Sequence, residues 1–178
     1  MPCSYRDDPI LGPTLAYWML KRGARAMPLK RDIDPTEIPP KLLPHLQIID
    51  VVDGGARFRY RLIGTALVQA YGKEYTGTYA DELVSGERLR FIHSAYQAVC
   101  KTGAPIFSHN RYHTARGADI VANRFYMPLT DGGRTVDYIF GAMNFTMGDA
   151  THGAWGGARL EPAEQYIEPV DMRAAMTA

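Results

Sequence analysis

The sequence predicts an α+β fold in which a five-stranded antiparallel sheet carries short helices on one face and an extra helix near the N-terminus. Two strand-like segments, residues 46–53 and 56–63, come first along the chain. Short helical segments and one long helix follow, and three long strand-like segments complete the pattern. Runs of strands separated by a run of helices are typical of α+β proteins, because strict alternation would instead favour a parallel sheet.

An amphipathic helix is expected ahead of the sheet. It starts at Asp8-Pro9 or, better, at Gly12-Pro13, because proline is tolerated in a first turn and is costly further in. The following segment, residues 25–40, contains four prolines and is predicted to be an extended connector. Residues 1–40 are therefore expected to form an N-terminal helix and a proline-rich connector.

The apolar stripe of this helix leads to a prediction about partners. Leu15, Trp18 and Met19 lie on one face of the helix. A stripe of this kind must be buried against the sheet or against a second subunit. We predict a homodimer formed through these three side chains.

The stretch of residues 56–83 organises the centre of the chain. Its first strand alternates apolar side chains with arginines, which is the pattern of a strand with two different faces. Gly64 ends the alternation, and Thr65 is placed to cap a short helix at residues 66–71. A second small helix is expected at residues 79–83, and helices this short are stable only when they pack on a larger element.

The second half of the chain supplies a long helix and the remaining strands. Apolar residues recur at helical spacing over residues 85–101. Three strands are expected after it: residues 105–116, 119–129 and 135–147. Residues 41–148 are therefore predicted to form the main domain. The last segment, residues 149–178, is rich in Gly, Ala and Pro and is expected to be loosely ordered or docked on a neighbour.

Two stretches of this pattern are similar to a known family. RDIDPTEIPPKLLPHLQIIDVVD and RFRYRLIGTALVQAYGKEYTG resemble a proteobacterial, stand-alone branch of the PAS domain family, and the resemblance extends over residues 15–147. It implies the PAS fold. It also implies a sensory or regulatory role in signal transduction, through a small molecule or a protein partner.

Composition and charge exclude several classes of protein. The net charge of the 178 residues is +1, so the sequence does not favour binding to nucleic acid or to an anionic membrane. No apolar run is long enough to cross a bilayer. Cys3 and Cys100 form neither a disulfide framework nor a metal motif, and a reducing cytoplasm is the expected location. The sequence identifies no cofactor.

A ligand pocket is expected between the sheet and the small helices, because these helices are too short to fill the space beneath them. Its walls are predicted from alternating or stripe positions that face the helical layer: Tyr60, Leu62, Leu67, Tyr71, Phe91, Phe125, Met127, Tyr138 and Phe140. Aromatic and apolar residues with a few polar groups are typical of small-molecule sites. The same residues are equally typical of a filled core.

Arg61 has two interpretations. The first is an ion pair that fixes a helix to the sheet, with Asp50, Asp81 or Glu82 as the partner. The second is an anion clamp in the pocket, for a ligand with a carboxylate. Arg124 on the fourth strand is a further polar group in a mostly apolar sheet.

The histidines do not predict a metal or haem site. His109 and His113 are four residues apart on a strand, which separates them by about 13 Å, too far to share a metal ion. His93 lies in the apolar stripe of the long helix, where a hydrogen-bonded core histidine is the expected role. Asp119 with His109 is the best acid–base pair that the sequence offers to an enzyme.

We therefore predict a PAS-like sensory domain and no enzymatic activity. The sequence lacks the motifs of a histidine kinase, a diguanylate cyclase or a DNA-binding helix-turn-helix, so it is expected to have no output domain of its own and to signal through a protein contact. Two alternatives remain open. One is a small isomerase or dehydratase on a curved α+β sheet, and the other is a structural adaptor that binds no ligand.

Overall fold

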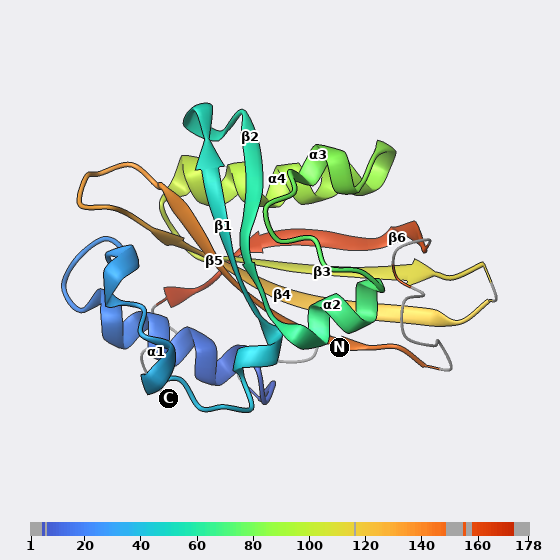
Figure 1. Cartoon of the computed structure of the whole chain (residues 1–178), viewed down its shortest axis with the longest axis horizontal. Coiled ribbons are helices and arrows are strands. Elements are labelled where there is room, and N and C mark those ends of the chain that lie inside the picture. The colour runs from blue at the N-terminus through green and yellow to red at the C-terminus, as the bar shows by residue number, and fades with distance from the viewer. Residues whose placement is uncertain (1–4, 6, 116, 149–154, 156–157, 173–178) are drawn as a thin grey trace.

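A single antiparallel sheet forms the centre of the molecule (Figure 1). The computed structural model describes residues 5, 7–115, 117–148, 155 and 158–172. The sheet has six strands in the order β2-β1-β5-β4-β3-β6. Their bounds are β1 (Leu46–Val52), β2 (Arg57–Ile63), β3 (Ile106–His113), β4 (Asp119–Leu129), β5 (Tyr138–Thr146) and β6 (Arg159–Pro169). The mixed α+β fold and the antiparallel sheet were both predicted.

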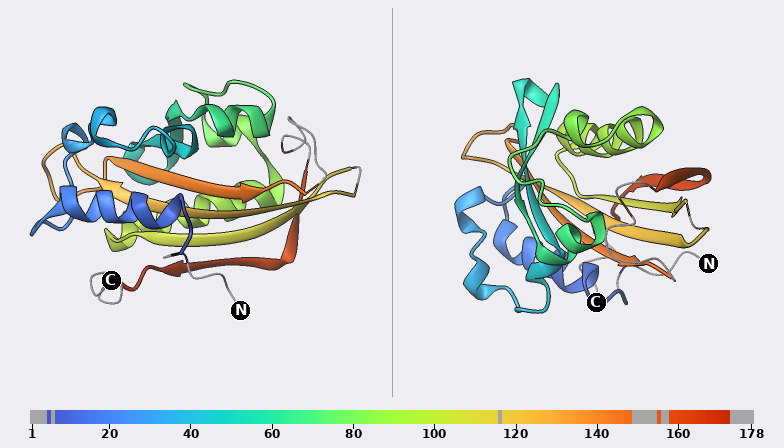
Figure 2. Two further views of the ribbon diagram at one scale, coloured as in Figure 1. Left: turned by 90° about the horizontal axis from the view of Figure 1, so that it is seen from below. Right: turned by 45° about the vertical axis from the view of Figure 1, so that its right-hand side comes forward.

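The helices cover both faces of the sheet. They are α1 (Leu11–Arg22), α2 (Thr65–Tyr71), α3 (Ala80–Leu83) and α4 (Gly86–Thr102). Short 3-10 turns lie at Lys30–Asp32, Pro35–Glu37, Leu43–His45 and Asp53–Gly55. The right-hand view of Figure 2 places α4 on one side of the sheet and α1 on the other. None of the helices in the described ranges is long and apolar enough to span a membrane.

The sixth strand corrects the predicted number of five. β6 pairs in antiparallel fashion with β3, from Ile106 opposite Pro169 to His113 opposite Arg159. It lies in the segment that the sequence analysis treated as a tail. Its prolines interrupt the pattern expected of a central strand. Proline is tolerated on edge strands, and β6 is at the edge of this sheet.

Gly64 is required at the junction of β2 and α2 because the chain passes very close to another segment. Its amide donates to the carbonyl oxygen of Leu46 at 2.7 Å. A Cβ at Gly64 would lie 2.2 Å from the carbonyl oxygen of Pro44. Gly64 itself is the N-cap of α2, so the expected cap, Thr65, is instead the first helical residue.

The two faces of the sheet hold separate hydrophobic cores. On the α1 side, Trp18 is fully buried, and its Nε1 donates to the carbonyl oxygen of Pro128 at 2.9 Å. Leu15 is buried in the same core, against side chains such as Phe140 from the sheet. Leu15 and Trp18 thus pack within their own chain. The apolar stripe of α1 was predicted to be buried against the sheet or against a second subunit, and for these two residues it is buried against the sheet.

Candidate functional site

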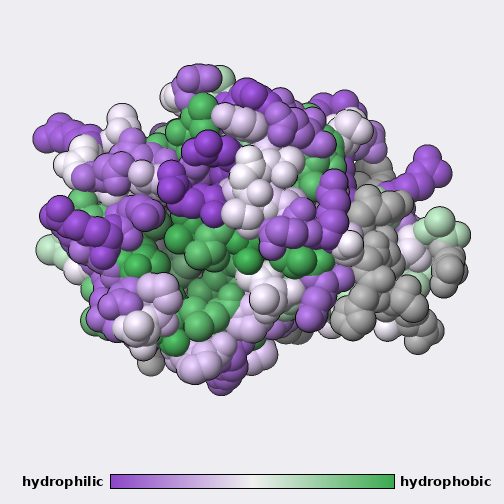
Figure 3. All heavy atoms as spheres, viewed as in Figure 1, coloured by the Kyte–Doolittle hydropathy of each residue, from purple (hydrophilic) through white to green (hydrophobic). Residues whose placement is uncertain are grey.

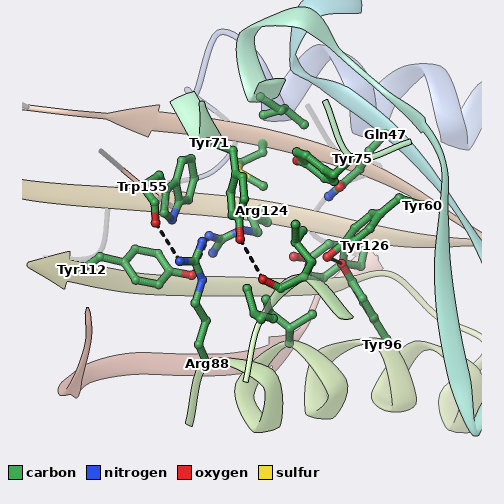
Figure 4. Close-up of a pocket in the computed structure, with 15 residues that line it drawn as sticks. Gln47, Tyr60, Tyr71, Tyr75, Arg88, Tyr96, Tyr112, Arg124, Tyr126 and Trp155 are labelled. Atoms are coloured by element: carbon green, nitrogen blue, oxygen red, sulfur yellow. Dashed lines mark hydrogen bonds between the residues drawn. The ribbon is translucent and has the colours of Figure 1, made fainter. Parts of the chain in front are cut away.

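A cavity lies between the sheet and the layer formed by α2, α3 and α4 (Figure 4). Its volume is about 40 Å³, and a water molecule needs roughly 10–15 Å³ measured in this way. Aromatic, aliphatic and polar side chains line it: Gln47, Tyr60, Leu67, Tyr71, Tyr75, Leu83, Val84, Arg88, Ile92, Tyr96, Tyr112, Arg124, Tyr126, Met143 and Trp155. The cavity is small, and its walls are rich in hydrogen-bonding groups.

Secondary structure places these groups by its periodicity. Arg88, Ile92 and Tyr96 are four residues apart along α4, so they share the helix face that looks onto the sheet. Arg124 and Tyr126 are two apart on β4, so both point to the same face of the sheet. The helix and the strand therefore bring an arginine and a tyrosine each to the cavity.

Phenol rings form one end of the cavity. Tyr96 contacts Tyr126 edge to face, with ring centres 4.9 Å apart, and its hydroxyl lies 3.4 Å from that of Tyr60. Tyr75 packs against Tyr60 with ring centres 5.0 Å apart. Figure 4 places these four rings together, close to Gln47. Burial raises the pKa values of Tyr60, Tyr75, Tyr96 and Tyr126 above the ordinary range, so these phenols are neutral hydrogen-bonding groups.

Arg124 is the most deeply buried cation of the site, with 3% of its surface exposed. Its Nη1 donates to Oδ1 of Asn110, and its Nη2 donates to the hydroxyl of Tyr112 at 3.1 Å. Burial opposes its charge, but the surrounding phenols, Tyr112 first among them, outweigh burial and raise the pKa of Arg124. The guanidinium therefore stays charged in the interior.

Arg88 extends from α4 to the end of the cavity where Tyr112 and Trp155 lie, beside Arg124. Its Nη1 donates to the carbonyl oxygen of Trp155 at 2.7 Å, and its guanidinium lies 4.9 Å from the centre of the Tyr112 ring. Figure 4 shows Arg88 and Arg124 side by side next to Tyr112 and Trp155. Burial alone would raise the pKa of Tyr112, but the charges of Arg124 and Arg88 outweigh it, so that pKa is lowered.

Several buried donors of the cavity have no hydrogen-bond partner within the described part of the chain. They include Nε2 of Gln47, Nε of Arg88 and Nε1 of Trp155. Buried polar groups are nearly always paired in folded proteins, with other protein groups or with water. The walls of this cavity thus offer donors that an occupant of the cavity could satisfy.

Comparison with protein-family models matches residues 9–144 to a PAS domain. The chain belongs to the PAS domain family. The match covers α1, the connector, the other helices, strands β1 to β4 and most of β5, and it does not include β6. PAS domains are in general sensory or regulatory domains and are typically not enzymes. A search of curated proteins found no match.

Within this PAS domain, only some of the predicted wall residues line the cavity. Tyr60, Leu67 and Tyr71 do so. Phe91 is buried on α4 but is not part of the lining. Leu62 points away from the cavity and is 43% exposed.

The predicted residues of β4 and β5 lie on the other side of the sheet. Phe125, Met127 and Phe140 belong to the core under α1, and Tyr138 packs at the edge of that core. The prediction assigned the more apolar alternating positions of these strands to the sheet face that borders the cavity. Because helices cover both faces of this sheet, that set fills an ordinary core, while Arg124 and Tyr126 face the cavity.

Leu62 lines a second, outer hollow on the surface of the molecule. Apolar residues of the connector and of β1 and β2 surround it, including Ile33, Ile38 and Leu62 together with Phe140. Figure 3 shows green, hydrophobic side chains in a depression on this face of the molecule. The hollow is separate from the cavity, because the two linings share no residue.

Arg61 lies in an ion pair outside the cavity. Its Nε donates to Oδ1 of Asp50, which was one of the three predicted partners. Arg59 binds the other carboxylate oxygen of Asp50, with Nη2 at 2.7 Å from Oδ2. The Asp50 side chain is 7% exposed, whereas that of Arg61 is 43% exposed. Arg61 is therefore placed to neutralise a buried carboxylate and not to contact a ligand in the cavity.

His109 and Asp119, the acid–base pair proposed for the enzyme alternative, each have a different hydrogen-bond partner. Nδ1 of His109 lies 2.7 Å from Oδ1 of Asn123. Asp119 instead contacts His113 at 2.6 Å and Arg111 at 2.7 Å, at the far ends of β3 and β4. His93 packs edge to face on Phe58 and does not line the cavity.

Most of the polar lining was not among the predicted site residues. The residues not predicted are Gln47, Tyr75, Arg88, Tyr96, Tyr112, Tyr126 and Trp155, and Arg124 was expected only as a polar group in the sheet. One available signal was the high tyrosine content, 11 residues in 178. Another was the spacing of Arg88, Ile92 and Tyr96, which puts an arginine on the apolar face of the long helix.

Proposed function

We propose that this PAS domain is a sensory domain that binds a small molecule in the cavity between the sheet and α2–α4. One observation supports this most strongly: the cavity is walled by buried donors that have no partner among the residues that the structure describes, including Nε1 of Trp155 and Nε2 of Gln47. A buried polar group left without a partner costs about 1–3 kcal/mol. A bound molecule with acceptor atoms recovers that free energy, so occupancy of the cavity stabilises the fold and can report the presence of the molecule.

Native mass spectrometry of freshly purified protein tests this proposal. We expect extra mass on the folded chain that disappears under denaturing conditions, or a defined small molecule that raises the melting temperature when it is added. A chain that carries no extra mass, and that no member of a metabolite library stabilises, would favour the structural adaptor.

We propose further that the domain transmits its signal by contact with a protein, and a homodimer through the N-terminal helix remains our prediction. Leu15 and Trp18 are already buried in their own chain, so the surface of α1 available to a partner holds Leu20, which is 76% exposed, and the partly buried Met19. Light scattering of the wild-type protein and of Leu20→Asp tests this. The proposal predicts a dimer that the substitution weakens, and a monomer in both samples contradicts it.

The cytoplasmic location predicted from the cysteine content also remains a proposal. The enzyme alternative receives less support, since the described lining of the cavity contains no Asp, Glu, His or Cys to act as an acid or base.

A further inference from the structure

Among the residues that the structure describes, the cavity has positive charge without a matching negative charge. Arg88 and Arg124 both line it, and none of the lining residues in the described ranges is an aspartate or a glutamate. Neither arginine takes part in an ion pair with any acidic residue that the structure describes, although other arginines such as Arg57, Arg59 and Arg111 do. The two cavity arginines differ in this respect from Arg57, Arg59 and Arg111.

Burial makes this arrangement costly for Arg124. A charge that leaves water without an opposite charge loses much of its hydration free energy, and proteins normally pair such charges. The hydrogen-bond acceptors that Arg124 has are neutral: Oδ1 of Asn110 and the hydroxyl of Tyr112. Arg88 adds a second positive charge next to the same tyrosine ring. An anion close to both guanidinium groups would compensate for the burial of one and for the repulsion between the two.

The unpartnered donors point to the same kind of ligand. Nε of Arg88 and Nε1 of Trp155 can only donate hydrogen bonds and never accept them. Trp155 is 4% exposed and lines the cavity, and its ring centre lies 5.5 Å from the guanidinium carbon of Arg124. An occupant of this end of the cavity must therefore supply acceptor atoms.

The remaining walls limit the size and character of the ligand. Leu67, Val84, Ile92 and Met143 are apolar, and the tyrosine rings present mostly carbon. A volume of about 40 Å³ admits only a few heavy atoms. We propose that the cavity binds a short-chain monocarboxylate, with its carboxylate held by Arg124, Arg88 and Trp155 and its apolar end among the aliphatic and tyrosine side chains.

Carboxylate fits better than inorganic phosphate for one reason. A guanidinium can bind either anion with two parallel hydrogen bonds, but a monocarboxylate has a single negative charge and an apolar end, which suit a site that also has apolar walls. Phosphate would place polar oxygens against those apolar walls. This inference rests on the proposed function, because it names the chemical class of the ligand for the same cavity.

Titration with sodium propionate tests the inference, with sodium chloride keeping the ionic strength constant. We expect a saturable rise in melting temperature with propionate, and no rise with propionamide, its neutral isostere. A larger rise with inorganic phosphate than with propionate would overturn the proposal that the ligand is a carboxylate.

Variants separate binding from folding. Methionine has a volume similar to that of arginine and no charge, so Arg124→Met should weaken propionate binding at least tenfold in protein that still folds. Arg88→Met should weaken binding in the same direction. Arg90→Met is the matched control on the same helix, because its side chain is 72% exposed, and it should bind propionate like the wild type.

The outcomes distinguish this inference from the proposed function. Loss of stability in Arg124→Met together with unchanged propionate binding would mean that the arginine is purely structural, and would overturn the inference. If a neutral compound is released from the purified protein on denaturation, the ligand proposal for the cavity stands and the carboxylate is wrong. If neither a released compound nor any added carboxylate is found, both proposals fail.

Discussion

At the scale of single residues, the site depends on which buried groups can carry charge. Four buried phenols, those of Tyr60, Tyr75, Tyr96 and Tyr126, resist ionisation because burial disfavours the phenolate. Tyr112 behaves in the opposite way because two guanidinium groups lie next to it. The four phenols at one end of the cavity therefore stay neutral. Tyr112, at the other end, ionises more readily than an ordinary tyrosine.

This difference predicts a loss of stability at alkaline pH. A phenol whose pKa is raised in the folded state contributes stability below about pH 10, the ordinary pKa of tyrosine, and that contribution is lost as the pH rises further. Tyr112, with its lowered pKa, changes stability in the opposite direction, but the four raised phenols outnumber it. The free energy of unfolding, measured with urea at several pH values, should therefore fall above about pH 10.

The variant Tyr96→Phe is the internal comparison, because it removes one of these phenols and leaves the ring. Its unfolding free energy should fall less steeply with pH than that of the wild type. Equal slopes in the two proteins would show that Tyr96 ionises normally in the fold.

A second prediction concerns Asp50, whose buried carboxylate has two arginine partners. Removing either one leaves the other in place, so Arg59→Met and Arg61→Met should each lower the melting temperature only slightly. The double variant leaves Asp50 without a partner and should lose more stability than the sum of the two single changes. For comparison, combining Arg61→Met with Arg57→Met should be additive, because Arg57 pairs with Asp81 and Glu82. Additive losses in the Arg59 and Arg61 pair would contradict the shared ion pair.

At the scale of secondary structure elements, close contacts between backbones hold the helices on the sheet. Gly64 lets the start of α2 pass against the turn at Pro44. Trp18 fixes α1 to the opposite face through a hydrogen bond to Pro128. Each contact can be tested by one substitution.

Gly64→Ala should destabilise the protein by about 1–3 kcal/mol, the usual cost of overpacking, because the atom that the new methyl group meets is a backbone oxygen that cannot rotate away. Gly133→Ala is the matched control, since its Cβ would meet Thr135 at ordinary distances, 3.6 Å from the side-chain Oγ1 and 3.9 Å from the backbone nitrogen. Urea denaturation measures both. Similar stabilities for the two variants would show that the chain relaxes around Gly64.

Trp18→Ala should cost about 3–5 kcal/mol, because it opens a large void in the core under α1 and removes a hydrogen bond. Ala16→Gln, at an exposed position of the same helix, should change the free energy of unfolding little. Denaturation of both variants by urea checks this. A small cost for Trp18→Ala would mean that α1 is only loosely attached to the sheet.

Most elements could be predicted from the sequence, whereas the assignment of sheet faces could not. The alternation of apolar and polar residues predicts strands β1 to β5, and helical spacing followed by a glycine predicts α2 and α4. These signals depend only on neighbouring residues in the sequence. The direction in which β4 and β5 point depends on what covers each face, and here both faces are covered. Phe125 and Met127 were therefore assigned to the cavity, although Arg124 and Tyr126 line it. β6 was not predicted because its prolines interrupt the pattern of a strand, although they are tolerated at the edge of a sheet.

At the scale of the whole molecule, one sheet separates a filled core from a cavity. The core under α1 is built from large apolar side chains such as Trp18, Phe125 and Phe140. The other face has its own hydrophobic core and a cavity that two arginines and a group of tyrosines line, under α2, α3 and α4. The packing of the two cores offsets the cost of the polar groups around the cavity.

The most direct test of this account is a crystal structure of the protein grown with sodium propionate. The account predicts a bound molecule in the cavity, with its carboxylate within hydrogen-bond distance of Arg124 and of Nε1 of Trp155. A cavity that holds only water, or that its own side chains have closed, would contradict the claim that this cavity is the ligand site.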